Sequence, residues 1–279
     1  MSDPRHAARQ PAGASPACQC VYVAEDWLLL ASCPGGYASS RAAAPAVMGS
    51  SDGGFTVTPA RGEALRARLT LHAQKSLSAA EGEALFCLYV NPITRAGAAI
   101  QAAALGTVCA GPAPSAEVLA LIERTASLAA GRGDPTTVRG GVDALLQALT
   151  PNTVAPAPDP HVQTVIRVLD RADGMQLGVP DLAAVTGLSA DYLRQHFKRR
   201  TGCSLSGYRL WLRLRHLAQV ALEGTARGEG ADLTRLSIGA GFYDSAHAAH
   251  FAQAYFGASL SALGAAACGM VDCRLSVAA

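Results

Sequence analysis

The chain has 279 residues, of which half are hydrophobic and 16% are charged, and its formal net charge is +2. No stretch reaches the roughly 18 consecutive apolar residues that a membrane span needs, and the N-terminus lacks the apolar core of a signal peptide. We therefore expect a cytoplasmic protein that has no membrane partner and is long enough for two domains.

Residues 1–20 are predicted to be a disordered leader, because charged residues and a Pro/Ala run offer little apolar surface. The eight cysteines form no C-x-x-C pair, so the sequence supports neither a zinc site nor a disulfide framework. Cys18 and Cys20 are close together but have no second pair of ligands. We predict no metal and no cofactor.

Residues 21–90 are predicted to be rich in strands, because short apolar runs alternate with Gly, Pro and Ser. Within this segment, Leu65 to His72 alternates apolar and polar side chains, as one half-buried strand does. Two helices are predicted after it, at residues 115–130 and 136–149, each able to pack on the sheet or on a second subunit.

The segment "GSSDG", Gly49 to Gly53, matches G-x-S-x-G, the pattern of a serine nucleophile on a strand-to-helix turn. Its context argues against that role, because Pro45 interrupts the apolar run before it and "GFTVTP" after it indicates a strand. We interpret Ser51 as a turn residue, and we expect no enzyme.

Residues 151–160, "PNTVAPAPDP", predict a linker between two domains, because four prolines forbid a regular helix and favour an extended chain. Residues 161–279 then read as short helices. Pro180 suits a first helical turn, Leu182, Ala183 and Val185 are expected to face inward, and Gly187 can end the helix in a left-handed conformation. Ser189 can cap the next helix, which gives the layout of a helix-turn-helix.

The second helix of this unit has a basic surface. Leu193 and Phe197 lie one turn apart and are predicted to pack inward, which leaves Arg194, Gln195 and Lys198 outside. No carboxylate interrupts the cations of residues 194–215, which are Arg194, Lys198, Arg199, Arg200, Arg209, Arg213 and Arg215. Such a one-sign surface attracts a polyanion.

A long helix from residue 204 leads to a second, weaker copy of the unit. Gly239 and Gly241 mark its turn, and residues 245–256 are its second, exposed helix. His247 and His250 are spaced for one helical face, but two ligands without a nearby acid or thiol do not make a metal site.

Residues 161–266 resemble the DNA-binding domain of the AraC/XylS family of bacterial transcription regulators. The resemblance rests on order and spacing across both units: Leu182-Ala183, Gly187-Leu188-Ser189, Leu193, Phe197-Lys198, Gly202, Ser204, Tyr208, "WLRLR" at 211–215, Gly241-Phe242, Asp244-Ser245, His247, Phe256-Gly257 and Ser259. More faintly, residues 69–97 resemble the cupin-like sensor domains attached to some members, without their clustered histidines; only His72 is present.

The resemblance implies an α+β protein: a small β-rich, cupin-like domain at 21–150 for effector binding or oligomerisation, and an all-α domain at 161–279 that places two recognition helices in the major groove of double-stranded DNA. It also implies RNA polymerase as a partner, and leaves open a small-molecule effector and a homodimer. The implied DNA-facing residues are Ala190, Asp191, Arg194 and Gln195 in the first unit, with Lys198, Arg199 and Arg200 after them, and Ser245, Ala246, Ala249 and His250 in the second.

Two departures from the family pattern concern the second unit. Ala248, Ala252, Gln253 and Ala254 stand where core aromatics and cations are expected, and residues 223–232 lengthen the connection before it. The sequence therefore predicts a weaker second reader. The alternative function, of a different class, is a hydrolase-like enzyme in residues 21–150 that uses Ser51 or a thiol such as Cys33 and carries a DNA-binding tail. A third possibility is a degenerate regulator that acts through protein contacts.

Overall fold

The computed structural model describes residues 20–33, 37–51, 53–83, 85–104, 108–110, 114–130, 133–151, 159–171, 174–226, 237–238, 241–256 and 267–270. The predicted leader at 1–19 and most of the predicted linker, residues 152–158, lie outside these ranges. Cys20, which we assigned to the leader, instead begins the first strand and is fully buried. Within the described ranges, no helix combines the length and the apolar character that crossing a bilayer requires.

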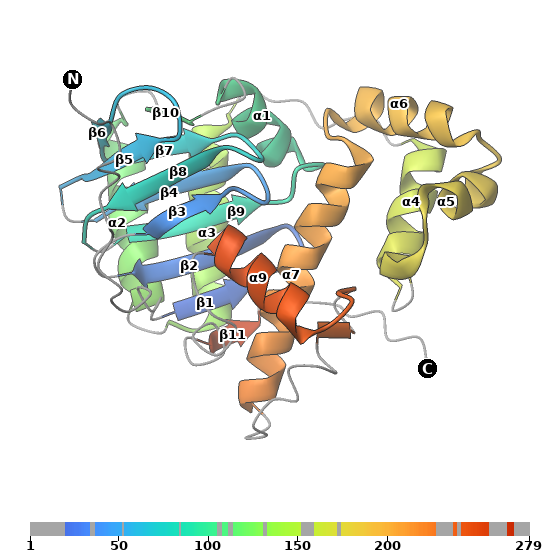
Figure 1. Ribbon diagram of the computed structural model, residues 1–279. Helices are drawn as coiled ribbons and strands as arrows, with labels where there is room; N and C mark the ends of the chain where they lie inside the picture. Colours follow the sequence, from blue (N-terminus) through green and yellow to red (C-terminus); the bar gives the residue numbers. More distant parts are fainter. Residues whose placement is uncertain are drawn as a thin grey trace, which may run out of the picture.

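The N-terminal half is β-rich, as predicted (Figure 1). Its elements are β1 (Cys20–Val23), β2 (Trp27–Cys33), β3 (Tyr37–Arg41), β4 (Ala46–Ser50), β5 (Phe55–Pro59), β6 (Leu65–Ala67), β7 (Leu69–His72), β8 (Leu77–Glu81), β9 (Leu85–Val90), α1 (Arg95–Ala103), β10 (Val108–Ala110), α2 (Ala116–Ala130) and α3 (Pro135–Leu149). The two predicted helices are α2 and α3, whereas α1 was not predicted.

Two sheets are formed from these strands. One has seven strands in the order β10-β7-β4-β9-β2-β1-β11, and the other has four in the order β3-β8-β5-β6. The strand β11 (Ala267–Met270) comes from the far end of the chain and pairs in parallel with β1. The C-terminal segment therefore completes a sheet of the N-terminal half.

The segment from Leu65 to His72 is two strands, so the prediction of a single one was wrong. β6 pairs with β5 in the small sheet, and β7 pairs with β4 and β10 in the large sheet. All four residues of β7 are buried, polar ones included. Strict alternation therefore misled the prediction, because the chain passes from one sheet to the other at Arg68.

The seven-stranded sheet is buried on both faces, which explains its continuous apolar runs. In β9, Phe86, Leu88 and Val90 pack with α1, α2 and α3, which cover one face. The alternating residues Cys87 and Tyr89 belong to a second core, which includes side chains of the small sheet and of the helical half. One sheet therefore separates two apolar cores.

The C-terminal half is helical. Its elements are α4 (Pro160–Leu169), a 3-10 turn at Gly174–Gln176, α5 (Val179–Thr186), α6 (Ala190–Thr201), α7 (Leu205–Ala226) and α9 (Ser245–Phe256). Figure 1 shows the long helix α7 between the β-rich domain and the group α4–α6, with α9 lying against β3. The predicted β-rich domain followed by a helical domain is thus confirmed, but the prediction that residues 161–279 are all helical was wrong at β11.

Specific polar contacts join the two halves. Gln74, in the turn after β7, donates from Nε2 to the carbonyl oxygens of Ala43 at 2.6 Å and Gly207 at 2.8 Å. Arg215 of α7 donates to the carbonyl oxygen of Glu25 at 3.1 Å. The hydroxyl of Tyr89 donates to the carbonyl oxygen of Tyr255 in α9 at 3.0 Å. Both α7 and α9 are therefore tied to the N-terminal sheet region.

Candidate nucleic-acid interface

The helices α5 and α6 meet at a turn that requires a glycine. Gly187 ends α5 with φ of 68°, a left-handed conformation that costs glycine little. The Ser189 Oγ then caps α6 by accepting a hydrogen bond from the Tyr192 N–H at 3.3 Å. Leu193 and Phe197 are fully buried, and the Phe197 ring packs on Tyr208 of α7. The predicted helix-turn-helix is confirmed.

One residue of the first unit was placed wrongly. Val185 was expected to face inward with Leu182 and Ala183, but its exposed fraction is 56%. Leu182 and Ala183 are buried as expected, because they lie on the side of α5 that meets α4 and α6. A short helix has only a narrow buried stripe, and Val185 lies outside it.

The outer face of α6 carries the predicted base-reading residues. Asp191, Arg194 and Gln195 are exposed, whereas Ala190 is half-buried. Arg194 Nη1 donates to Asp191 Oδ1 at 2.6 Å, an exposed ion pair one turn apart. The pair holds the guanidinium along the helix surface, with its remaining N–H groups available as donors.

The basic end of α6 is more engaged than the sequence suggested. Lys198 is exposed. Arg199 lies over the ring of Tyr192, with its Cζ 5.8 Å from the ring centroid, and its Nη2 is 3.2 Å from His196 Nδ1. Arg200 Nε donates to Asp159 Oδ2 at 3.0 Å. Two of the three predicted phosphate-binding cations thus have contacts within the protein.

Asp159 connects the end of the linker to α6, a role that was not predicted from the sequence. Its carboxylate caps α4 by accepting from the His161 and Val162 N–H groups, and it also lies 3.0 Å from His196 Nε2. Burial opposes the charged form, but the Val162 N–H, His196 and Arg200 outweigh it and lower the pKa of Asp159 to about 2. Asp159-Pro160 is a recognisable cap signal, but its partners on α6 are remote in sequence.

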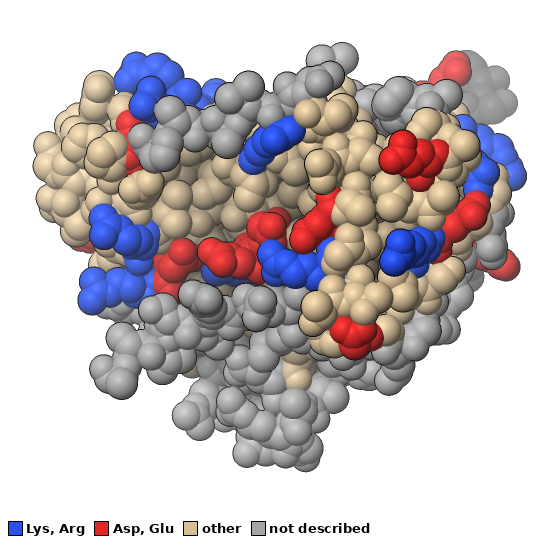
Figure 2. Space-filling model, turned by 180° about the vertical axis from the view of Figure 1, so that it is seen from behind, with Lys and Arg blue, Asp and Glu red and all other residues tan. Residues whose placement is uncertain are grey.

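The predicted uninterrupted basic surface was wrong for two of the three cations of α7, and the third, Arg213, is half-buried. Arg209 donates to the carbonyl oxygens of Leu177 and Met175, at 2.6 and 2.8 Å. Arg215 is buried and bonds to Asp170 as well as to Glu25. Figure 2, viewed from behind, shows basic and acidic side chains interspersed, with acidic ones gathered across the middle of that face. The basic surface is therefore concentrated on α6.

The second unit has an exposed helix with few charges. Asp244 Oδ1 accepts from the His247 N–H at 2.7 Å at the start of α9. Ala246, Ala249 and His250 are exposed, and Ser245 is half-buried. The predicted bounds of this helix, 245–256, are those of α9. Of the predicted turn, Gly241 has φ of 83°, and Gly239 lies outside the described residues.

Aromatic rings fill the core of the second unit beside its small buried alanines. Ala248 and Ala252 are fully buried, and the rings of Phe242, Phe251 and Tyr255 pack in sequence with centroids 5.0 and 4.5 Å apart. The ring of His247 packs edge-on against Phe242 at 5.3 Å. Across the part of the chain that the structure describes, no group of three His, Cys, Asp or Glu could hold a metal ion.

Ser51 follows β4, so our expectation that no strand precedes it was wrong. The strand β5 follows it, however, and the strand-to-helix turn of a serine nucleophile is therefore not formed there. His72, the other candidate of this half, is buried between Thr70 and Ser78, with hydrogen-bond distances of 2.8 and 3.4 Å. Burial lowers the pKa of His72 to about 4, so it is a neutral core residue.

Comparison with protein families identifies the helical half. The family described as "Helix-turn-helix domain" matches residues 182–265, which span both units. The chain carries a helix-turn-helix domain of the AraC type. The resemblance of the helical half that was read from the sequence is thereby confirmed, and the domain supports a DNA-binding transcription regulator. No curated protein matches the chain by sequence.

Comparison with solved structures finds similar chains at low sequence identity. Apo ToxT from Vibrio cholerae is 9% identical, with a TM-score of 0.51 over 85% of this chain and 96% of ToxT. ToxT with an unsaturated fatty acid bound is 9% identical, with a TM-score of 0.45 over 86% of this chain and 95% of that structure. The AraC-like activator CuxR is 16% identical, with a TM-score of 0.33 over 71% and 78%. The match to apo ToxT supports the fold of both halves together.

Proposed function

We propose that the chain is a sequence-specific transcription regulator that binds the major groove of duplex DNA through α6 and α9, under the influence of its N-terminal domain. The observation that carries this proposal is the coincidence of the family match, residues 182–265, with two exposed helices joined by α7. The proposed function includes no catalysis, and RNA polymerase is its proposed protein partner.

The first unit is proposed to supply most of the sequence discrimination. Arg194 and Gln195 present the groups that make paired hydrogen bonds to guanine and adenine edges. The exposed Lys198 is suited to phosphate, which positions the helix without reading sequence. Release of Arg194 from Asp191 costs little, because the pair is exposed to solvent.

The second unit is proposed to read DNA more weakly, about one helical turn away. The residues proposed to face DNA, the half-buried Ser245 and the exposed Ala246, Ala249 and His250, include no Lys or Arg. Small neutral side chains can approach the groove closely, but they contribute little electrostatic binding energy with the phosphates. The resulting binding site should be asymmetric, with more information in the half that α6 contacts.

Modulation by the N-terminal domain is proposed to act through its contacts with α7 and α9. Gln74 bonds to Gly207 near the start of α7, and Tyr89 bonds to Tyr255 near the end of α9. An effector or a second subunit that shifts the β-rich domain would therefore move the second unit with it. A homodimer through this domain is part of the proposal.

A selection from randomised duplexes tests the assignment of the two readers. We expect Arg194→Ala to relax preference at one or two base pairs, at a cost on the order of 1 to 3 kcal/mol, and His250→Ala to have a smaller effect. Arg61→Ala, an exposed cation of the N-terminal domain, serves as the control. Equal information in both half-sites, or a preference of Arg194→Ala identical to wild type, would show that the readers are assigned wrongly.

A further inference from the structure

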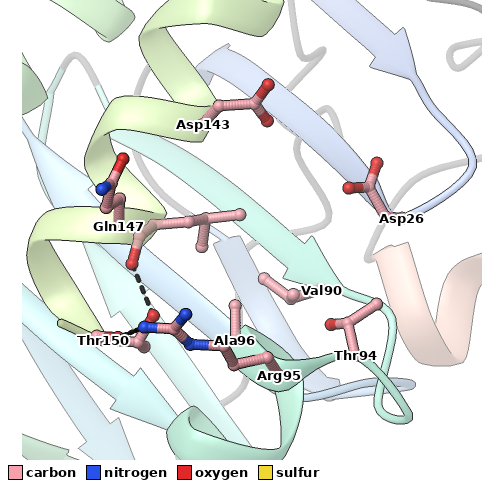
Figure 3. A pocket seen from close by; sticks show the side chains of 9 residues that line it. Asp26, Val90, Thr94, Arg95, Ala96, Asp143, Gln147 and Thr150 are labelled. Carbon is pink, nitrogen blue, oxygen red and sulfur yellow. Dashed lines mark hydrogen bonds between the residues drawn. The ribbon is translucent and has the colours of Figure 1, made fainter. Parts of the chain in front are cut away.

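A cavity of about 300 Å³ lies on the N-terminal domain, between the end of α3 and the turn from β9 to α1 (Figure 3). This volume is at the lower end of the range of small-molecule sites, roughly 300 to 1,000 Å³. The lining is of mixed character: Val90, Ala96 and Leu146 are apolar, and Asp26, Thr94, Arg95, Asp143, Gln147 and Thr150 are polar. The lining is thus more polar than that of most small-molecule sites, which favours a ligand with a charged group and a small apolar body.

One wall of the cavity is rigid. The Asn91 carbonyl accepts from the Thr94 N–H at 3.1 Å and from its hydroxyl at 2.7 Å, and Asn91 Oδ1 accepts from the Ile93 N–H at 3.2 Å. A Cβ on Gly97 would lie 2.1 Å from the Asn91 carbonyl oxygen, so the close approach of α1 requires glycine. A ligand that binds against this wall does not have to order it.

The charges favour a cation at one end of the cavity. Asp26 and Asp143 share the guanidinium of Arg139, and each N–O distance is 3.6 Å, too long for a hydrogen bond. Among the described residues, the buried Asp26 Oδ1 has no hydrogen-bond partner. Burial raises the pKa of Asp143 and the charge of Asp26 adds to this rise, whereas Arg139 and the side chain of Trp27 oppose it. Arg139 therefore makes no hydrogen bond to either carboxylate, and the two side chains, 39% and 51% exposed, remain accessible to a ligand from solvent.

The opposite end of the cavity is closed by the protein itself. Arg95 Nη2 donates to the carbonyl oxygens of Thr150 and Pro151, at 3.2 and 2.9 Å, beyond the last turn of α3. The C-terminal end of α3 carries a partial negative charge, and the guanidinium of Arg95 is the cation that lies there. Because Thr150 and Pro151 lead into the linker, the cavity adjoins the connection to the DNA-binding half.

We propose that this cavity binds a small organic amine in its protonated form, with the ammonium group between Asp26 and Asp143 and an apolar body against Val90, Ala96 and Leu146. The ammonium supplies the donors that Arg139 does not supply at hydrogen-bond distance. The claim that the amine is an effector rests on the proposed function of the chain. The claim that the cavity binds the amine does not depend on that function.

The test uses 2-phenylethylamine as the probe and calorimetry on the full chain without DNA. We expect saturable one-to-one binding with a Kd below about 1 mM, and at least tenfold weaker binding of the neutral isostere 2-phenylethanol. Asp143→Asn and Leu146→Phe should each weaken binding of the amine at least tenfold, the first by removing charge and the second by filling the cavity. The control Glu123→Gln, an exposed carboxylate of α2, should bind as wild type does.

Absence of saturable binding, equal binding of the alcohol, or unchanged binding by Asp143→Asn would each overturn the proposal. Circular dichroism of every variant shows whether it is folded, and Asp26→Asn replaces Asp143→Asn if that variant is not. DNA binding of the same samples is measured separately by fluorescence anisotropy. Retained DNA binding without amine binding would refute the cavity alone, whereas loss of DNA binding in wild type would refute the proposed function.

Discussion

Asp159 offers a sharp test of how α6 is held, because one carboxylate performs two separable tasks. It caps α4 through two backbone N–H groups, and it accepts hydrogen bonds from His196 and Arg200 of α6. Asn can cap a helix as well as Asp, but it lacks the charge. Asp159→Asn therefore removes mainly the contact with α6, and Asp159→Ala removes both tasks.

The expected magnitudes follow from these contacts. Loss of a cap costs about 1 kcal/mol of folding free energy. A hydrogen bond to a charged group contributes about 1.5 kcal/mol or more, which we reduce to about 1 because the Arg200 side chain is 44% exposed. The hydrogen bond from His196 adds about 1 kcal/mol. We expect losses of about 3 kcal/mol for Asp159→Ala and about 1 to 2 for Asp159→Asn.

Asp134 is a matched control within the same chain. It caps α3 by accepting from the Thr137 N–H at 3.0 Å and also accepts from the Thr137 hydroxyl; like Asp159 it is followed by a proline, but it is exposed and both contacts lie within α3. Asp134→Ala should therefore cost less than Asp159→Ala, and Asp134→Asn less than Asp159→Asn. Urea unfolding of the four variants, followed by circular dichroism, measures the differences. Equal losses at the two positions would refute the proposed contact with α6.

The dependence on pH provides a second check of Asp159. Its folded pKa of about 2 lies below the ordinary value of 3.8, so its charge contributes stability above the ordinary value. That contribution is lost as the pH falls from about 4 towards 2. The stability difference between wild type and Asp159→Asn should therefore shrink over this range and stay constant above it.

Three further outcomes are expected. Lys198→Ala should reduce the slope of log affinity against log salt by about one unit for all duplexes, whereas Arg61→Ala should not change it. Gly207→Ala should destabilise the chain, because the new Cβ would lie 2.4 Å from Gln74 Oε1, and the loss should be smaller in a Gln74→Ala background, where the nearest atoms are Ser204 Oγ at 3.0 Å and Cys203 Sγ at 3.1 Å. Residues 160–279 alone should keep helical circular dichroism but melt at a lower temperature than the full chain, because α7 loses the core that it shares with the β-rich half.

The first helix-turn-helix could be predicted because its determinants are local. Gly187 ends one helix, Ser189 begins the next, and Leu193 and Phe197 select the buried face, all within eleven residues of sequence. Each of these effects depends on a residue type and its immediate neighbours. The predicted unit therefore agreed with the structure without knowledge of the rest of the chain.

The roles of the cations could not be predicted in the same way. Arg209 and Arg215 have the same chemistry as Arg194, but their partners are backbone carbonyls and a carboxylate at sequence distances of 32 to 190 residues. A run of like charges in sequence shows only that no local carboxylate neutralises it. Whether an arginine is free for DNA depends on remote groups that the fold brings to it.

The two recognition helices differ in what holds them, and this difference bears on regulation. The basic end of α6 is bonded to Asp159, which belongs to the same helical half, and its core rests on Tyr208 of α7. The helix α9 has small buried alanines, and it bonds to Tyr89 of the β-rich half and lies against β3. A displacement of the β-rich half should therefore move α9 more than α6. Regulation through the N-terminal domain would then act on the weaker reader, where a small change in position alters the total affinity without removing the sequence preference of the first.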